Sequence, residues 1–171
     1  GGSFEGITDV VKNRMGKSIE QRPKDILTRK EIGHWEMDTV VSGMGKSKVC
    51  LLVLSERATR QEQIFKIPNK QAESVKIALD RLERKLGSKK FRDTYKTITC
   101  DNGVEFLDYT GLEKSIRNKR TRRTTIYYCH PYCSSERGTN ENQNKLIRRF
   151  IPKGADISKY TEEDIIYRDL E

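Results

Sequence analysis

The sequence predicts an α/β domain with a mixed five-stranded sheet and helices on both of its faces. Three strand-like runs follow one another, and helical and strand-like segments then alternate along the rest of the chain. No internal repeat interrupts this order, and 171 residues suffice for one hydrophobic core. We therefore expect a single domain in which three antiparallel strands are extended by further strands reached through helices.

The first three strands are predicted from the apolar pattern between positions 34 and 68. The segment 34–43 (HWEMDTVVSG) leads into a glycine-rich stretch typical of a hairpin turn. The segment 48–57 (KVCLLVLSER) is apolar at nearly every central position, which predicts a strand buried on both faces. The segment 60–68 alternates polar and apolar residues and stops at Pro68, as expected of a third antiparallel strand.

A helix and a fourth strand come next, and the strand delivers an acidic residue at its end. Apolar residues recur with helical spacing over 70–86, and Gly87 is a suitable C-cap. The segment 96–100 (KTITC) predicts a short strand that ends directly before Asp101. The remaining predicted elements are a short helix at about 106–116, a strand at 124–129, a helix from about 139 to 150 and a helix-prone acidic tail.

The net charge of +9, from 34 Lys and Arg against 25 Asp and Glu, favours nucleic acid as a partner over an acidic membrane. No apolar run approaches the ~18 residues of a membrane helix, and the first residues lack the features of a secretion signal. The densest basic run, 117–123, is a candidate phosphate-binding segment, and a solvated loop is the alternative interpretation. Its four candidate DNA-binding residues are Lys119, Arg120, Arg122 and Arg123.

The four cysteines are at positions 50, 100, 129 and 133. Cys129 and Cys133 flank His130 in a C-x3-C spacing, but a closed zinc site needs four ligands and the chain has one further histidine, His34. Reduced, structural thiols are the favoured interpretation. The sequence leaves open whether the Cys129 and Cys133 pair has any role.

Three acidic residues stand out by position. Asp38 lies within the first predicted strand, where an aspartate is unfavourable unless it has a partner. Asp101 follows the fourth strand in CDNGVEF, and Glu141 lies in the first turns of the last long helix. If the first and fourth strands are neighbours, Asp38 and Asp101 converge and the last helix can bring Glu141 over them.

Clustered carboxylates of this kind stay ionised when a hard cation lies between them. Oxygen ligands suit Mg²⁺ or Mn²⁺ rather than zinc. Two such ions can activate a water or a 3′-hydroxyl and stabilise the leaving oxygen of a phosphodiester. Because the chain has 25 acidic residues, structural carboxylates are the competing interpretation.

Three blocks of the sequence carry a specific resemblance: GHWEMDTVVSG, TCDNGVEF and HPYCSSERGTNENQNKLIRRFIPKG. They resemble the signature blocks of bacterial insertion-sequence transposases of the IS-thirty family, and the resemblance covers nearly all of residues 18–160. The third block is the most specific because it is long. The resemblance implies a DDE transposase whose catalytic domain is similar to RNase H and retroviral integrase.

The resemblance assigns the catalytic and metal-binding triad to Asp38, Asp101 and Glu141. Glu136 and Glu105 are rivals for the third place. Glu141 is preferred because it lies in the RGTNEN part of the third block. The stretch between Asp101 and Glu141 looks a few residues longer than is usual for the family, which we attribute to the basic run.

Other residues take supporting roles by the same resemblance. Asn144, Lys145 and Arg148 follow Glu141 on one helical face, where they would contact DNA. Asn102 and Glu105 would orient the loop that carries Asp101.

The resemblance also implies a domain organisation. Residues 1–30 are expected to form an arm or linker that joins a helix-turn-helix domain outside this chain. Residues 31–171 are expected to form the RNase H-like catalytic core, which stops short of the family's usual C-terminal end.

The implied reaction is phosphoryl transfer on DNA with Mg²⁺ or Mn²⁺ as cofactor, two ions being expected. Hydrolysis at a transposon end frees a 3′-hydroxyl, and this hydroxyl attacks a phosphodiester of target DNA. A homo-oligomer on DNA, in the bacterial cytoplasm and at the nucleoid, is expected by analogy. The alternatives are a nuclease on the same scaffold that cuts without joining and a noncatalytic DNA-binding domain.

Overall fold

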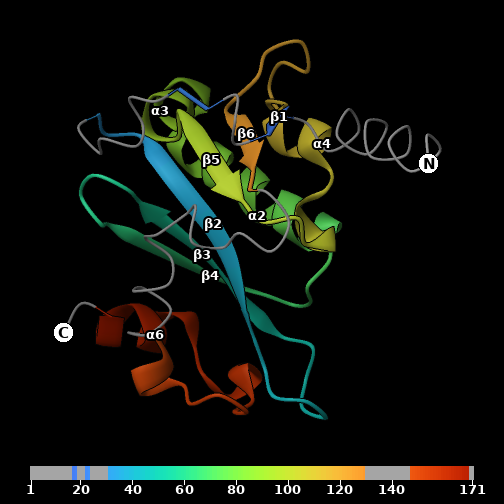
Figure 1. Ribbon diagram of the computed structural model, residues 1–171, viewed down its shortest axis with the longest axis vertical. Helices are drawn as coiled ribbons and strands as arrows, with labels where there is room; N and C mark the ends of the chain where they lie inside the picture. The colour runs from blue at the N-terminus through green and yellow to red at the C-terminus, as the bar shows by residue number, and fades with distance from the viewer. Residues whose placement is uncertain (1–16, 19–21, 24–30, 130–146, 170–171) are drawn as a thin grey trace, which may run out of the picture.

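The computed structural model describes residues 17–18, 22–23, 31–129 and 147–169, the last four of them by their backbone alone. The described strands form one mixed sheet in the order β1-β6-β5-β2-β3-β4 (Figure 1). Their bounds are β1 Lys17–Ser18, β2 His34–Val41, β3 Cys50–Glu56, β4 Glu62–Ile67, β5 Thr97–Cys100 and β6 Thr125–Tyr128.

The directions of the strands confirm the predicted mixed sheet. β2, β3 and β4 are antiparallel neighbours, as their short connections require. β5 lies parallel to β2, and β6 lies parallel to β5. The sheet has one strand more than the five predicted, because Lys17 and Ser18, in the segment expected to be an arm, pair with Tyr127 and Tyr128 as β1.

The described helices differ from the prediction in two places. Their bounds are α2 Ala72–Leu86, α3 Ser88–Thr94, η3 Val104–Phe106, α4 Tyr109–Glu113, η5 Ile157–Lys159 and α6 Glu162–Asp169, and residues 147–150 are also helical. The helix predicted at 106–116 is wrong in length: Asp108 caps α4 by accepting a hydrogen bond from the Gly111 N–H, so a turn separates α4 from η3. α3 was not predicted because Phe91 is its one buried residue, which gives no periodic signal.

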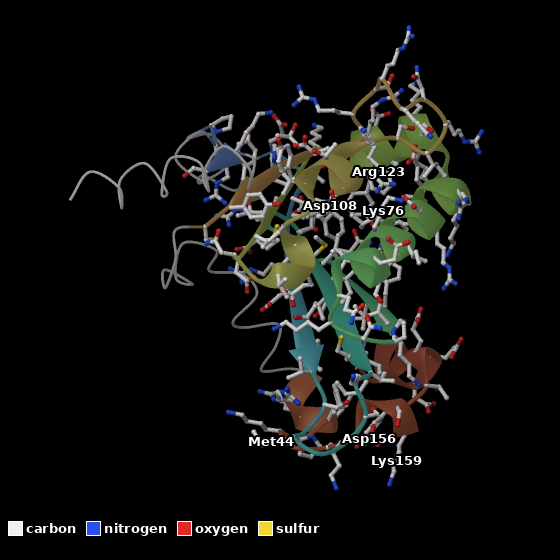
Figure 2. The ribbon with its side chains drawn as sticks, turned by 90° about the vertical axis from the view of Figure 1, so that its right-hand side faces the viewer. Met44, Lys76, Asp108, Arg123, Asp156 and Lys159 are labelled. Atoms are coloured by element: carbon white, nitrogen blue, oxygen red, sulfur yellow. The ribbon has the colours of Figure 1, made fainter. Side chains whose placement is uncertain are left out.

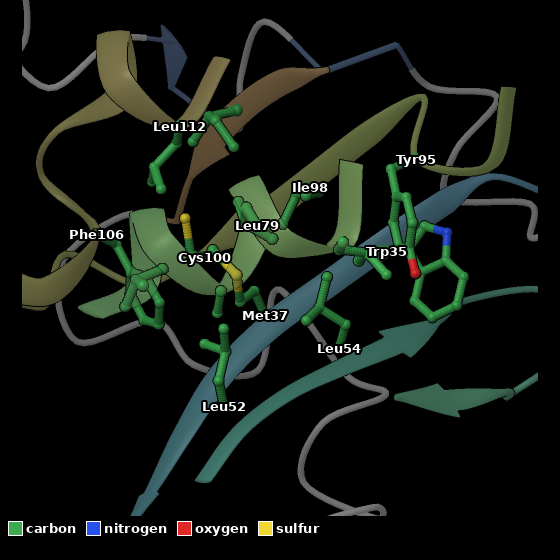
Figure 3. Packing of buried hydrophobic residues seen from close by; sticks show 14 of the residues in the cluster. Trp35, Met37, Leu52, Leu54, Leu79, Tyr95, Ile98, Cys100, Phe106 and Leu112 are labelled. Carbon is green, nitrogen blue, oxygen red and sulfur yellow. The ribbon is translucent and has the colours of Figure 1, made fainter. Parts of the chain in front are cut away.

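Two hydrophobic cores lie on opposite faces of the sheet, so the predicted helices on both faces are confirmed. On one face, Leu52 and Leu54 of β3 pack with Leu79 of α2 and with residues of α3 and α4 (Figure 3). On the other face, Leu51 and Val53 pack with apolar residues of the segment 147–165. β3 is therefore an interior strand buried on both faces, as its apolar sequence predicts.

The C-terminal segment is fixed to the β2–β3 hairpin by direct backbone contact. The Gly43 N–H donates to the Ala155 carbonyl at 2.9 Å. A Cβ at Gly43 would lie 2.1 Å from the Gly154 carbonyl oxygen, so only glycine allows this approach. Figure 2 shows Met44, at the hairpin tip, at the same end of the molecule as Asp156 and Lys159.

The open edge of the sheet is covered by the same segment. The backbone N–H of Lys66 on β4 donates to the Glu162 carboxylate at 3.0 Å. The Lys66 ammonium donates to the carbonyls of Ser158 and Tyr160. These contacts occupy polar groups of an edge strand that would otherwise be open to another chain.

Candidate active site

The structure brings Asp38 and Asp101 together at the carboxyl ends of two adjacent parallel strands. The register of β2 and β5 pairs Met37 with Cys100, and Asp38 and Asp101 are the next residue on each strand. Neighbouring strands are about 4.8 Å apart, and residues in register project to the same face. Both side chains are half-buried. The two residues were expected to converge if the first and fourth predicted strands were neighbours, and these strands, β2 and β5, are neighbours.

Local hydrogen bonds hold the two aspartates. Asp38 Oδ1 accepts from the Thr39 N–H at 2.8 Å. Asp101 Oδ1 accepts from the Gly103 N–H at 2.8 Å, which is the turn an aspartate before glycine favours. Asn102 Nδ2 donates to the Cys129 carbonyl at 2.6 Å and so ties the loop to the end of β6.

Glu105 is buried between the two aspartate-bearing segments, with 1% of its surface exposed. Its Oε2 accepts from the Thr39 hydroxyl at 3.1 Å and lies 3.3 Å from Lys70 Nζ. Its Oε1 is buried and has no hydrogen-bond partner in the described part of the chain. Glu105 therefore contacts β2 directly after Asp38.

Gly103 explains how Glu105 also reaches the loop of Asp101. A Cβ at position 103 would lie 1.8 Å from Glu105 Oε1 and 2.9 Å from Asp101 Oδ1. The two carboxylates thus flank the same point, and a side chain there would displace one of them. The glycine of DNG is required by this close approach.

The donor set at this edge of the sheet fits a hard divalent cation. It consists of carboxylate oxygens, and one of them, Glu105 Oε1, is buried and makes no hydrogen bond to any described residue. Oxygen-only ligands suit Mg²⁺ or Mn²⁺. Among the described residues, no three His, Cys, Asp or Glu side chains already form a ligand group. The predicted third ligand, Glu141, and its rival Glu136 lie outside the described residues.

The basic run 117–123 divides into exposed residues and one buried residue. Lys119, Arg120 and Arg122 are exposed and available to a partner. Arg123 is 1% exposed, and its inclusion among the DNA-binding residues is wrong. Its guanidinium lies between α2 and α4 (Figure 2) and binds Asp80 at 2.7 Å and Glu83 at 3.1 Å. A cation held by these partners inside the domain cannot reach a DNA phosphate.

The last predicted DNA-facing helix is described from residue 147 onward. Asn144 and Lys145 lie outside the described residues. Arg148 Nη2 donates to the Val41 carbonyl at 3.2 Å, at the end of β2. Burial lowers the pKa of Arg148. This contact fixes the helix to the sheet, and a contact of Arg148 with DNA stays a prediction.

The described thiols are consistent with reduced cysteines in the interior. Cys50, Cys100 and Cys129 are buried. Burial, followed by the nearby charge of Glu105, raises the pKa of Cys50 to about 11, so this thiol stays protonated at neutral pH. Cys133 lies outside the described residues.

Sequence reasoning did not single out Lys70, Thr39 or Gly103. Thr39 and Gly103 each lie next to a residue that was singled out, and Lys70 lies just before α2. The signal available for Gly103 was its place in DNGVEF, between Asp101 and Glu105. For Lys70 no local pattern was available, because its partner Glu105 is 35 residues away in the chain.

Comparison with known proteins places these observations in a family. The chain is 38% identical to the "Probable transposase for insertion-like sequence element IS1161" of Streptococcus salivarius. This match extends over 152 residues, which are 89% of this chain and 40% of that protein. It is 38% identical to the transposase for element IS4351 of Bacteroides fragilis, over 86% of this chain and 41% of that protein. It is 33% identical to transposase InsI for element IS30C of Escherichia coli K12, over 88% of this chain and 36% of that protein.

These matches are limited to one part of each relative. The chain spans about 40% of the length of the curated relatives it matches. No protein-family model matches the chain. No described helix is long and apolar enough to cross a membrane.

A solved structure supports the fold. A chain of the simian T-cell lymphotropic virus intasome, solved in complex with the PP2A regulatory subunit B56 gamma, aligns with a TM-score of 0.55 at 13% identity. The alignment covers 80% of this chain and 46% of that chain. It agrees with an RNase H-like α/β fold, as predicted. The chain is therefore similar, at 33–38% identity over most of its length, to one part of IS30-type transposases.

Proposed function

We propose that this domain carries out the DNA chemistry of a DDE transposase: divalent-metal-dependent hydrolysis at transposon ends and transfer of the freed 3′-hydroxyl into target DNA. The observation that carries the proposal is the register of β2 and β5. It makes Asp38 and Asp101 neighbours at the same edge of the sheet, in a domain similar to transposases over most of its length.

The catalytic residues we propose are Asp38, Asp101 and Glu141. Asp38 and Asp101 would hold Mg²⁺ or Mn²⁺ between them, and Glu141 would complete the ligand set. A divalent ion bound there would offset the negative charge that develops on the phosphate during the transfer.

The surrounding residues hold the aspartates in place. The Thr39 and Gly103 N–H groups fix one oxygen of each aspartate. Glu105 bridges the two segments through Thr39 and Gly103. Since the attacking oxygen belongs to water or to DNA, no side chain has to act as a covalent nucleophile.

The proposed partner is DNA, both the transposon end and the target. The net charge of +9 and the exposed residues Lys119, Arg120 and Arg122 support binding to the phosphate backbone. Transposition joins two ends, so we propose a homo-oligomer on DNA at the bacterial nucleoid.

The test is strand transfer by the Asp101→Asn variant on a pre-cleaved donor end. The amide removes the anionic ligand and keeps the size of the side chain, so we expect joining to fall below detection while DNA affinity is retained. Asp93→Asn, an exposed carboxylate on α3, is the control and should join at the wild-type rate. Joining by Asp101→Asn at the wild-type rate would contradict the proposal. Cutting by the wild-type chain without joining would identify a nuclease instead.

A further inference from the structure

A basic pocket lies beside the carboxylates of the candidate active site. Its volume is about 320 Å³, and it is lined by the end of β2, the β2–β3 hairpin and the residues at the start of α2. Lys48 and Lys70 bring positive charge to it, and Asn69 and Gln71 bring amides. None of the described residues that line it is acidic. We call it the Lys48–Lys70 pocket.

Lys70 joins this pocket to the candidate active site. Its ammonium lies 3.3 Å from Glu105 Oε2, and its side chain is 49% exposed whereas that of Glu105 is 1% exposed. An ammonium has three N–H donors, so the pair with Glu105 leaves donors directed toward solvent. Lys48 is also exposed.

The carboxylate of Asp156 contacts Ser47, one of the residues that line the pocket. It accepts from the Ser47 hydroxyl at 2.6 Å and from the Ser158 hydroxyl at 2.6 Å. Asp156 is thus held by two serines and does not line the pocket. The charge inside the pocket remains that of the two lysines.

The position of the pocket points to a backbone phosphate of DNA as its ligand. Lys70 contacts Glu105, Glu105 contacts Gly103, and Gly103 follows Asp101 by two residues. Each DNA strand carries a charge about every 3.4 Å along the helix axis. A strand with one phosphate at Asp38 and Asp101 would therefore present a nearby phosphate to Lys70.

We propose that the Lys48–Lys70 pocket binds a phosphate of the DNA strand next to the phosphate that reacts. The choice of DNA rests on the proposed function of the domain. Lys70 is a phosphate ligand here, and its contact with Glu105 keeps the ammonium between the pocket and the loop of Asp101. Lys48 is the second ligand.

The first experiment measures the salt dependence of binding to a 30-base-pair duplex by the full chain in EDTA, where no reaction occurs. Each lost phosphate contact lowers the slope of log K against log salt concentration by about 0.9. We expect Lys70→Gln to lower the slope by about this amount, and the double variant Lys48→Gln with Lys70→Gln by about twice as much. An unchanged slope for Lys70→Gln would overturn the proposal.

Lys96→Gln is the matched control for Lys70→Gln. Lys96 is 45% exposed and lies 3.3 Å from Glu31, so its exposure and the length of its ion pair match those of Lys70, whereas its partner is exposed. Lys96 directly precedes β5 and Asp101 directly follows it, so the two residues lie at opposite ends of this strand. We expect a wild-type slope for this variant, and an equal loss in both variants would show a general charge effect and overturn the proposal.

A second experiment separates a phosphate ligand from a residue that only neutralises Glu105. If Lys70 only neutralises Glu105, adding Glu105→Gln to Lys70→Gln restores the wild-type slope, which overturns the proposal. If Lys70 binds phosphate, the double variant keeps the reduced slope. Duplexes with a single neutral methylphosphonate should show one linkage whose replacement weakens wild-type binding and has no effect on Lys70→Gln.

These results are independent of the catalytic assignment. Joining by Asp101→Asn would contradict the proposed function and leave the binding slopes as they are. A wild-type slope for Lys70→Gln would remove the pocket as a phosphate site and leave the aspartates as they are.

Discussion

Glu83 and Glu105 are two buried glutamates with basic partners, and they differ in how many of their carboxylate oxygens have hydrogen-bond partners. Glu83 is fully buried and accepts from the hydroxyls of Ser88 and Ser115, from the Ile116 N–H and from Arg123, which is itself buried. Glu105 is equally buried, but its two contacts share Oε2, and Oε1 has no hydrogen-bond partner among the described residues.

The difference separates structure from function within one domain. The cluster around Glu83 is closed, with each charge held by partners inside the protein, and its role is to fasten α2 to the segment before β6. The cluster around Glu105 has a half-exposed lysine and an unsatisfied oxygen beside Asp101. Buried polar groups without partners are rare and call for an explanation such as a ligand.

Among the variants that test this comparison, Arg123→Met is expected to change the free energy of unfolding most. Removing the cation leaves Asp80 and Glu83 buried without it. Breaking a buried ion pair from one side costs about 3–5 kcal/mol, so we expect the free energy of unfolding in urea to fall by about that amount. Arg122→Met is the control, and as an exposed residue it should change stability by about 0.5 kcal/mol or less. Equal losses in the two variants would contradict the assignment of Arg123 to the interior.

A smaller effect is expected from exchanging each glutamate for glutamine. In Glu83→Gln the amide nitrogen must face a donor, so we expect a loss of about 2–3 kcal/mol. In Glu105→Gln the nitrogen can take the place of the unpartnered Oε1, and the pair with half-exposed Lys70 is worth about 1 kcal/mol or less. Urea unfolding of both variants measures the difference. A Glu105→Gln variant as unstable as Glu83→Gln would show that both clusters are structural.

The smallest expected effect is the dependence of the free energy of unfolding on pH that Glu83 causes. Burial alone would raise the pKa of Glu83, but hydrogen bonds from Ser115, the Ile116 N–H, Ser88 and Arg123 outweigh it and hold the pKa below its usual range. A lowered pKa in the folded state stabilises the fold above the unfolded value of about 4.3, and this contribution is lost as the pH falls through the folded pKa. We expect the stability gap between wild type and Glu83→Gln to be constant from pH 6 to 5 and to narrow below about pH 4. A gap that widens on acidification would contradict the sign of the shift.

Much of the fold followed from the sequence because its signals are local. The helical spacing over 70–86 predicted α2, Ala72–Leu86, and the apolar run around Leu51 predicted a strand buried on both faces. β1 and α3 were missed for a local reason too: two residues, or one buried Phe91, give no pattern to recognise.

The candidate site was predicted in part. Asp38 and Asp101 could be singled out because an aspartate in a strand and one at a strand end are both unusual, and the family blocks contain them. Their closeness depended on which strands are neighbours, which the parallel pairing of β2 and β5 decides. The position of Glu141 over them stays a prediction.

The sequence by itself determined the resemblance to the transposase family, the periodicity of the main elements and the excess of positive charge, since each depends on residue type and spacing along the chain. Only the tertiary structure decided which charged side chains are buried and which are exposed. Arg122 is exposed and Arg123 is buried although they are adjacent, because Asp80 and Glu83 approach Arg123 from α2, about 40 residues away. Lys70 gained its place beside Glu105 in the same way. Whether a charge is buried depends on partners that only folding brings within reach.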